Sequence, residues 1–340
     1  MNATPETQIA EHECILPLYA RITGIVLISI IIVLGAVGNI AVCIILRVFK
    51  NRFDSVSHLF VINVAISDLL TSLTVVPFDV VYWTSFPVFP LSPSICRLWN
   101  ALYFAFLAAS SIGVSLIGVD IFLAVTKPLR YHVIVTKTKA YWILGISWLW
   151  SLAVGVLIYI FQEEPPQNAY LFELNTVAYG CYLIVHIALP SFVIPALYAK
   201  LFFIARGHAR KVEPSGPALT DVNRAKLTVK RQLSMAKTFL FITIVFFLCW
   251  YPFFIVQMFY VFQWEKYVDW CKLETTDTVV CWFGYVQCCI NPILYVFRRK
   301  NTRRIIFGQC RKPQQTGIFS VRKTMNTATG SPIKNATIME

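Results

Sequence analysis

Long apolar runs dominate this chain, and short polar stretches separate them at regular intervals. Seven runs are long enough, or nearly so, to cross a bilayer as a helix, which takes about 20 apolar residues. They cover residues 22–46, 57–78, 96–125, 141–161, 179–203, 238–262 and 278–297. The runs are continuous and lack the alternation of barrel strands, so they indicate helices. We therefore expect an all-α membrane protein, a bundle of seven transmembrane helices.

The polar stretches divide the chain into four parts. Residues 1–21 form an acidic extracellular N-terminus without the basic start of a cleaved signal peptide, and residues 22–297 form the seven-helix domain. Residues 298–310, "RRKNTRRIIFGQC", are basic and amphipathic, which predicts an eighth helix on the inner membrane surface. Residues 311–340 contain several Ser and Thr and few apolar residues, which predicts a disordered cytoplasmic tail.

Composition and charge agree with a membrane protein. The mean hydropathy is +0.64, and 57% of the residues are hydrophobic. With the N-terminus outside, only Arg21, Arg97, Lys266 and Lys272 of the 30 basic residues fall outside, which is the expected bias toward the cytoplasm. The net charge of +13 is therefore explained by a cytoplasmic face that meets anionic lipid and a partner, and no nucleic-acid partner is expected. A multi-pass protein of the plasma membrane with a cytoplasmic C-terminus follows.

Each of several apolar runs carries one unusual polar residue or proline. These are Asn39 in "GAVGNIAV", Asp68 in "NVAISDLL", Trp148 in "GISWLWSL", Pro190 eight residues before Tyr198, Cys249, Trp250 and Pro252 in "FFLCWYPFF", and Asn291, Pro292 and Tyr295 in "NPILY". A single feature of this kind is weak, but the whole set in this order is specific. From residue 22 to 310 the chain resembles a rhodopsin-like (class A) G-protein-coupled receptor.

The resemblance gives Asp68 a role. A carboxylate within the membrane is costly and is by default a functional hypothesis. In the family the matching aspartate faces a water-filled cavity that binds sodium, and Ser110 and Asn291 match other members of that cavity. The alternative is a buried Asp68 paired through water with Asn39 and Asn291. No other cofactor or metal is expected.

The resemblance also implies a conformational switch. Pro252 lacks a backbone N–H and is expected to kink the sixth helix, with Trp250 at the kink. Other positions match family residues that move or pack on activation: Asp120, Ile121, Tyr198, Pro190, Phe246, Asn291, Pro292 and Tyr295. Ser111 stands where this packing group usually has Ile. The implied partners are an extracellular small-molecule ligand, a heterotrimeric G protein, arrestin and membrane lipid.

Other stretches resemble amine, trace-amine and histamine-type receptors. They are "VVPF", "PLRYHVIVTKTKA", the two Phe after "CWYP", and "WFGY" in the seventh helix. Aromatic rings around a cation suit an amine ligand. Amine receptors, however, place an aspartate seven residues after the outer cysteine of the third helix, and here Tyr103 follows Cys96 at that distance. The candidate ligand-binding residues are Tyr103, Leu107, Asp79, Tyr182, His186, Trp250, Phe253, Phe254 and Tyr285.

Because Tyr103 cannot pair with an ammonium group, another acid must do so or the ligand is not a simple amine. Asp79, and Asp277 at the outer end of the seventh helix, are the two candidates. For Asp277 a rim position without a ligand is the preferred interpretation.

The outer cysteines depart from the family pattern. The second outer loop, "QEEPPQNAYLFELNTVA", has no cysteine to pair with Cys96. Cys181 could replace it, and Cys14 and Cys271 could form another bridge on the oxidising outer face, although connectivity cannot be read from sequence. Asn2 begins a glycosylation sequon, and Cys310 is a candidate palmitoylation site.

The inner end of the third helix reads Asp120-Ile121-Phe122, where the family has Asp-Arg-Tyr. The acidic residue that usually pairs with this arginine is absent too, because Gln232 stands at its position.

Two hypotheses for the function remain. One is a receptor, amine-receptor-like, that signals to a G protein; the other is a non-signalling or decoy binding protein or receptor modulator. The sequence carries no catalytic constellation, so an enzyme is disfavoured.

Overall fold

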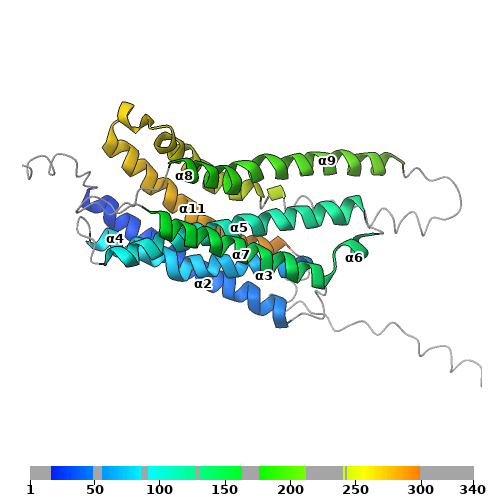
Figure 1. Cartoon of the computed structure of the whole chain (residues 1–340). Coiled ribbons are helices and arrows are strands. Elements are labelled where there is room, and N and C mark those ends of the chain that lie inside the picture. The colour runs from blue at the N-terminus through cyan, green and yellow to red at the C-terminus, as the bar shows by residue number, and fades with distance from the viewer. Residues whose placement is uncertain are drawn as a thin grey trace, which may run out of the picture.

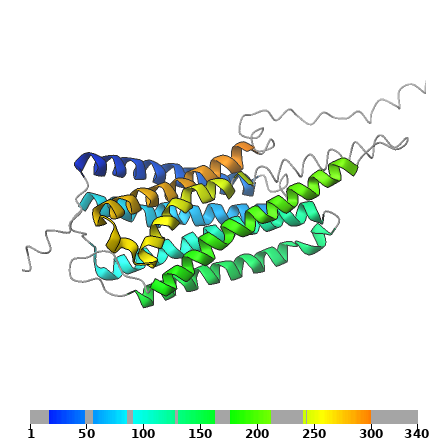
Figure 2. The same cartoon turned by 90° about the horizontal axis from the view of Figure 1, so that it is seen from above.

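The computed structural model describes residues 17–48, 56–85, 91–127, 130–162, 176–211, 240–241 and 243–298. Helices account for nearly all of these residues, and the long ones run side by side along one direction (Figure 1, Figure 2). The predicted eighth helix beyond Arg298, the first 16 residues and the tail lie outside the described residues.

The helices follow the order of the apolar runs. The first, third and fourth spanning helices are α2 Leu18–Val48, α5 Pro93–Thr126 and α7 Lys137–Phe161, with the short α6 Tyr131–Ile134 before α7. The second spanning helix consists of α3 Ser57–Leu70, the π turn η2 Thr71–Val75 and α4 Val76–Ser85, and the fifth consists of α8 Thr176–Leu183, the π turn η3 Ile184–Ala188 and α9 Leu189–Lys211. The sixth spanning helix is Thr243–Val261, and the short η4 Trp264–Tyr267 and α11 Trp270–Arg298 follow it.

Six of the helices in the described residues are long and apolar enough to span a membrane, and α11 completes the bundle as the seventh. Several extend past the apolar runs that predicted them: α9, for example, continues through polar sequence to Lys211. Local sequence sets other helix ends. Pro93 stands in the first turn of α5, where its missing N–H needs no partner, and the hydroxyl of Thr136 accepts from the backbone N–H of Lys139 to cap α7.

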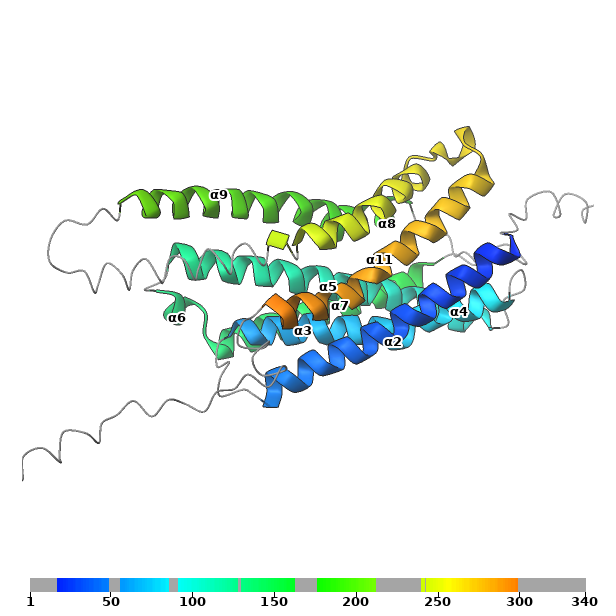
Figure 3. The ribbon, with the colours of Figure 1, turned by 180° about the vertical axis from the view of Figure 1, so that it is seen from behind.

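The third spanning helix, α5, lies at the centre. It packs against α3, α7 and α9, while α2 packs against α3, α4 and α11. Figure 3 shows α11 lying along α2, which is on the opposite side of the bundle from α9. Consequently α5 and α11 present side chains to several helices at once, and the candidate site residues are concentrated on these two.

Prolines inside the helices explain two contacts between helices. Pro190 and Pro292 have no N–H to donate to the carbonyls four residues earlier, those of His186 and Cys288. Each of those carbonyls accepts a hydrogen bond from another helix: Ser111 Oγ donates to His186 O at 2.5 Å, and Asn39 Nδ2 donates to Cys288 O at 3.0 Å. Neighbouring helices thus satisfy the backbone groups that proline frees within the membrane.

Both π turns directly precede a proline: η2 ends at Val75 two residues before Pro77, and η3 ends at Ala188 two residues before Pro190. A π turn inserts one extra residue into the helix and rotates the side chains on either side relative to each other. In the second and fifth helices, the side chains before and after the π turn therefore point in different directions around the helix axis than in a regular α-helix. Candidate site residues lie near these turns.

Candidate functional site

Four aromatic side chains from three helices form an outer cage, defined as Tyr103, Trp250, Phe253 and Tyr285. The Tyr103 ring meets the others edge-on, with centroids 6.4 Å from Trp250, 6.2 Å from Phe253 and 6.2 Å from Tyr285. Gly284 lets Trp250 approach α11, because a Cβ there would lie 3.0 Å from the indole ring. The structure thus brings together four predicted ligand-binding residues around the position of the missing aspartate.

Both candidate acids already hold hydrogen-bond donors. The Tyr285 hydroxyl donates to Asp79 Oδ2 at 2.9 Å, and Asp79 is 7% exposed. Asp277 Oδ1 accepts from Gln257 Nε2 at 2.5 Å, farther out on the sixth and seventh helices. Asp79 is therefore joined to the outer cage through Tyr285, whereas Asp277 belongs to the link between the two helix ends, in line with its predicted rim position.

The remaining predicted ligand-binding residues are not part of the outer cage. The Tyr182 hydroxyl donates to the backbone carbonyl of Phe104 at 2.9 Å, Leu107 is buried in the core, and Phe254 packs beside Tyr251. His186 differs most from expectation: its ring stacks near Tyr182 and accepts a hydrogen bond from Trp150 Nε1 at 3.4 Å. The π turn that contains His186, and the bond from Ser111 to its carbonyl, place the ring toward α7.

A chain of hydrogen bonds runs from the outer cage to the middle of the bundle. Trp250 Nε1 donates to Gln287 Oε1, and Gln287 Nε2 donates to Ser110 Oγ at 3.2 Å. Ser110 Oγ in turn donates to Asp68 Oδ1 at 2.9 Å, and Asn291 Nδ2 donates to Asp68 Oδ2 at 2.8 Å. We call these five residues the central network. It joins the second, third, sixth and seventh helices.

Two amide oxygens in or beside the central network accept no hydrogen bond from the described residues. Asp68 is 1% exposed, and the side-chain oxygens of Asn39 and Asn291 are buried without hydrogen-bond partners among the described residues. A carboxylate, a hydroxyl and amide oxygens are the ligands that a hard cation prefers. The residues present therefore fit a small cation such as sodium. In the described part of the chain, no group of three His, Cys, Asp or Glu side chains could hold a transition metal.

Asp120 has a different set of partners at the inner end. Ser57 Oγ donates to its Oδ2 at 2.6 Å, and the Tyr131 hydroxyl donates to its Oδ1 at 2.7 Å. Tyr131 lies in α6, between the third and fourth spanning helices. Burial, followed by its bond to Asp120, raises the pKa of Tyr131 above its ordinary value, so the phenol keeps its proton. We call Asp120, Ser57 and Tyr131 the inner cluster.

Ile121 lies beside this cluster but faces the apolar core. It is 4% exposed and belongs to the same buried group as Tyr198, Leu201 and Phe246. The Ile121 side chain can neither form a hydrogen bond nor carry a charge. The inner end of the third helix is thus closed by packing from Ile121 and by hydroxyl donors to Asp120.

Known receptors are similar to this chain over most of its length. The family described as "7 transmembrane receptor (rhodopsin family)" matches residues 38–295. This chain belongs to the rhodopsin family of seven-transmembrane receptors. The alpha-1A adrenergic receptor of Rattus norvegicus is 28% identical over 90% of the chain and 72% of its own length, and the histamine H2 receptor of Cavia porcellus is 28% identical over 83% and 78%. The predicted family, an amine-receptor type of the rhodopsin family, is confirmed. The family consists of receptors and not enzymes, so the prediction that this chain is not an enzyme is confirmed too.

The remaining switch positions are placed as follows. Tyr198 and Phe246 are buried in the same apolar core. Pro252 lies in the sixth helix, and Pro190 lies at the start of α9. Tyr295 is in α11, but its side chain lies outside the described part of the structure, as does Gln232.

One disulfide prediction is wrong. Cys96 and Cys181 are both free, because Cys96 is buried at the start of α5 while Cys181 is exposed on α8. Cys271 is disulfide-bonded, whereas the other cysteines in the described ranges are free. The predictions for Cys14, Asn2 and Cys310 fall outside the described residues.

Sequence reasoning missed three residues that hold these sites together. Gln287 is a polar residue inside an apolar run, one helical turn before Asn291, and that spacing places both on one face. Ser57 and Tyr131 gave a weaker signal: one starts a helix, and the other was noted only as part of a resembling stretch. Their shared contact with Asp120 links positions 63 and 11 residues away in the chain.

Proposed function

We propose that this receptor binds a small cationic ligand in the outer cage and transmits binding to a heterotrimeric G protein. Relatives named as adrenergic and histamine receptors support an amine-like ligand. The faces of Tyr103, Trp250 and Phe253 suit a cation through cation–π attraction, worth about 0.5–2 kcal/mol for each such contact. Asp79, joined to the cage through Tyr285, supplies negative charge to one side of it.

The observation that carries this proposal is the central network. Trp250 belongs both to the outer cage and to the chain of hydrogen bonds that ends at Asp68 and Asn291. A ligand that shifts Trp250 changes the bond to Gln287, and Gln287 holds Ser110 on Asp68. Binding is thereby coupled to the helices whose inner ends meet the cytoplasm. A binding protein without a signal has no need of this connection.

In this proposal a sodium ion at Asp68, Ser110 and Asn291 stabilises the resting state by neutralising the buried carboxylate. The inner cluster substitutes hydroxyl donors for the missing arginine, so the resting state does not depend on an ion pair there. Contact with the G protein, and with arrestin afterwards, relies on the basic cytoplasmic segments. The receptor then lies in the plasma membrane with its N-terminus outside, as the distribution of Lys and Arg predicts.

One observation favours the second candidate function, a non-signalling binding protein or modulator of another receptor. Ile121 is buried in the apolar core and offers no polar group to a G protein, while both carboxylate oxygens of Asp120 accept hydrogen bonds from Ser57 and Tyr131. The same geometry would keep the inner end closed.

The deciding experiment measures basal and ligand-stimulated activation of every Gα class in cells, across an amine panel. The native receptor, Ile121→Arg and Gln287→Leu are compared at equal surface expression. We expect the native receptor to respond, and Gln287→Leu to lose at least tenfold in potency because Trp250 no longer reaches Ser110 through its partner. The control is Ser29→Ala, an exposed serine of α2 whose hydroxyl donates only within its own helix and lies outside the central network.

Each outcome separates the two candidates. A response of the native receptor supports the receptor function and makes Ile121 a tolerated replacement. A response by Ile121→Arg alone means that the outer site works and the natural chain is uncoupled at that residue. If both are silent while a radiolabelled amine still binds, the non-signalling function is the correct one.

A further inference from the structure

Asp79 has the fewest hydrogen-bond donors of the three buried carboxylates in the described part of the chain. Both oxygens of Asp68 and both oxygens of Asp120 accept hydrogen bonds. Asp79 is 7% exposed, yet only its Oδ2 accepts, from the Tyr285 hydroxyl, and its Oδ1 accepts from no described residue. No described basic side chain pairs with Asp79 either. Because a buried carboxylate with one neutral donor is costly, a cationic partner would stabilise this acid.

A second acid, Asp277, lies on the same face of α11 as Tyr285. Asp277, Cys281 and Tyr285 follow one another at intervals of four residues, which places them along one face of the helix. That face meets Tyr103: Cys281 Sγ lies 4.0 Å from the Tyr103 hydroxyl, and the ring centroids of Tyr103 and Tyr285 are 6.2 Å apart. The Tyr103 hydroxyl is also within electrostatic range of Asp277. Asp277 and, through Tyr285, Asp79 therefore border the outer cage at two levels.

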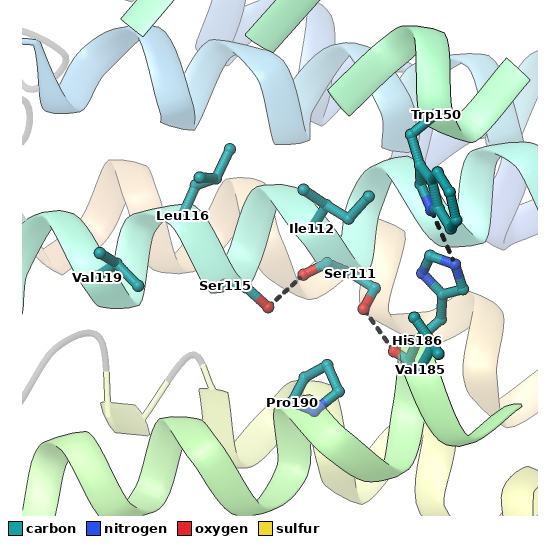
Figure 4. A pocket seen from close by; sticks show the side chains of 9 residues that line it. All are labelled: Ser111, Ile112, Ser115, Leu116, Val119, Trp150, Val185, His186 and Pro190. Carbon is teal, nitrogen blue, oxygen red and sulfur yellow. Dashed lines mark hydrogen bonds between the residues drawn. The ribbon is translucent and has the colours of Figure 1, made fainter. Parts of the chain in front are cut away.

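The predicted ligand-binding residues of the fifth helix bring no positive charge to these acids. Figure 4 shows His186 beside Trp150, whose Nε1 donates to His186 Nε2 at 3.4 Å, and Ser111 bonded to the His186 carbonyl. A histidine nitrogen that accepts belongs to a neutral ring. The Tyr182 hydroxyl is engaged by the carbonyl of Phe104. The positive charge that suits the two acids has to come with the ligand.

We propose that the ligand of the outer cage is a diamine, a short apolar chain with an ammonium group at each end. One ammonium pairs with Asp79 and the other with Asp277 at the rim, a contact that the sequence position of Asp277 alone did not favour. A carboxylate has about four acceptor positions, so each acid can keep its present donor, Tyr285 or Gln257, and take an ammonium as well. The inference rests on the proposed function, because it names the ligand of the same cage.

The spacing of the acids sets the length of the chain. Asp277 and Tyr285 are eight residues apart on α11, which is about 12 Å along the helix axis. A hydrogen bond from an ammonium to a carboxylate takes up about 2.8 Å at each end. About 6 Å then remains between the two nitrogens, which a saturated chain of about four or five carbons spans. The rings of Tyr103 and Phe253 suit both the apolar chain and its cationic ends.

The test measures binding by isothermal titration calorimetry on the full-length receptor in phosphatidylcholine nanodiscs. The probes are the linear diamines from diaminopropane to diaminooctane, each beside the monoamine of the same length in which a methyl group replaces one ammonium. We expect the diamines of intermediate length to bind roughly tenfold or more tightly than their monoamine counterparts, because the second ammonium meets a second carboxylate. The shortest diamine should lose this advantage, because it cannot reach both acids.

Variants assign the two ammonium groups to the two acids. Asp277→Asn should bring the ratio of diamine to monoamine affinity down to about one, because the second ammonium loses its partner. Asp79→Asn should weaken the binding of both amines roughly tenfold or more, while the asparagine oxygen still accepts from Tyr285. The matched control is Asp269→Asn, the same change at an exposed acid just before α11, which should keep the ratio. Should Asp79→Asn fold poorly, Asp277→Asn and the chain-length series carry the test.

The outcomes separate this inference from the function on which it rests. Diamines that bind as predicted support the inference, whether or not a G protein responds. Equal binding of diamine and monoamine, or an Asp277→Asn variant that keeps the native ratio, overturns the inference alone. Binding of neither amine overturns the inference together with the proposed cationic ligand.

Discussion

Asp68 and Asp120 are buried carboxylates of the same bundle, yet their surroundings differ in what they connect. Asp68 accepts from Ser110 and Asn291, and through Ser110 it is joined to Gln287 and Trp250 near the outer cage. Asp120 accepts from Ser57 and from Tyr131 of the inner loop helix α6. The central network spans helices toward the outer cage, whereas the inner cluster ties α6 to the second and third helices.

The comparison shows two ways to keep a carboxylate within a membrane without an ion pair. A buried acceptor is costly only when its donors are missing, and neutral donors satisfy it as long as the geometry is good. At Asp68 the donors belong to residues expected in this family. At Asp120 a serine and a tyrosine donate to the carboxylate, and they supply no positive charge.

The largest effect is expected from Asp120→Ala. The substitution leaves the Ser57 and Tyr131 hydroxyls without their acceptor in a mostly buried place, which should cost about 2–4 kcal/mol of stability. A clear fall in the melting temperature of the purified receptor checks it. Ser29→Ala, at an exposed serine of α2, is the control; an unchanged melting temperature for Asp120→Ala would mean that the inner cluster does not stabilise the fold.

Ser110→Ala should lower the free energy of unfolding somewhat less, by about 1–3 kcal/mol. Asp68 loses one donor and keeps Asn291, while Gln287 Nε2 loses its acceptor and keeps its contact with Trp250 through the other amide atom. Thermal melts with and without added sodium test this. If sodium raises the melting temperature of the native receptor but not of Ser110→Ala, the serine is part of the cation site; equal shifts would remove it from that role.

Tyr131→Phe should lower the free energy of unfolding by only about 1–2 kcal/mol, because Asp120 keeps Ser57 as a donor. A double-mutant cycle sharpens the contrast between the two regions. Tyr131→Phe and Asp120→Asn should be coupled, whereas Tyr131→Phe and Ser110→Ala should add within about 0.5 kcal/mol. Strong coupling across the second pair would show that the two regions form one network.

Tyr131 also predicts a pH dependence. Its pKa is raised in the folded state, so above the ordinary value of 10 the unfolded chain loses this proton first and the folded state is destabilised as pH rises. The native receptor should therefore lose melting temperature at alkaline pH more steeply than Tyr131→Phe. Parallel curves would contradict the buried environment of the phenol.

The smallest effect is expected at the outer rim, from Lys272→Gln. Lys272 Nζ lies 3.5 Å from Asp269 Oδ2, but both side chains are exposed, and such pairs contribute little. The pKa of Asp269 is lowered chiefly by the backbone N–H of Lys272, which the substitution keeps. No change in melting temperature is expected at pH 7; a fall as large as that of Tyr131→Phe would show that this exposed ion pair stabilises the fold as much as the buried hydroxyl does.

Much of the fold was predictable from sequence because it depends on local properties. The apolar runs are long enough to cross a bilayer, and the backbone can satisfy itself there only as helices. Motif positions also placed Asp68, Ser110 and Asn291 together, and the structure has them in contact. Those residues are identifiable because each is a polar exception in an otherwise apolar helix.

Other features depended on how the helices pack, which periodicity does not report. Cys181 was one candidate partner for Cys96, but their helices present Cys96 to the core and Cys181 outward. His186 had the spacing of a ligand contact, yet a π turn rotates it toward Trp150.

The sequence by itself determined that this chain is a seven-helix receptor with an acid in its middle and no arginine at its inner end. Only the tertiary structure decided what those residues bond to: Gln287 between Trp250 and Ser110, and Ser57 with Tyr131 on Asp120. The reason is physical. Hydrophobicity and backbone hydrogen bonding act along a single helix, whereas a buried polar group takes whichever donor the packing of other helices brings within about 3 Å.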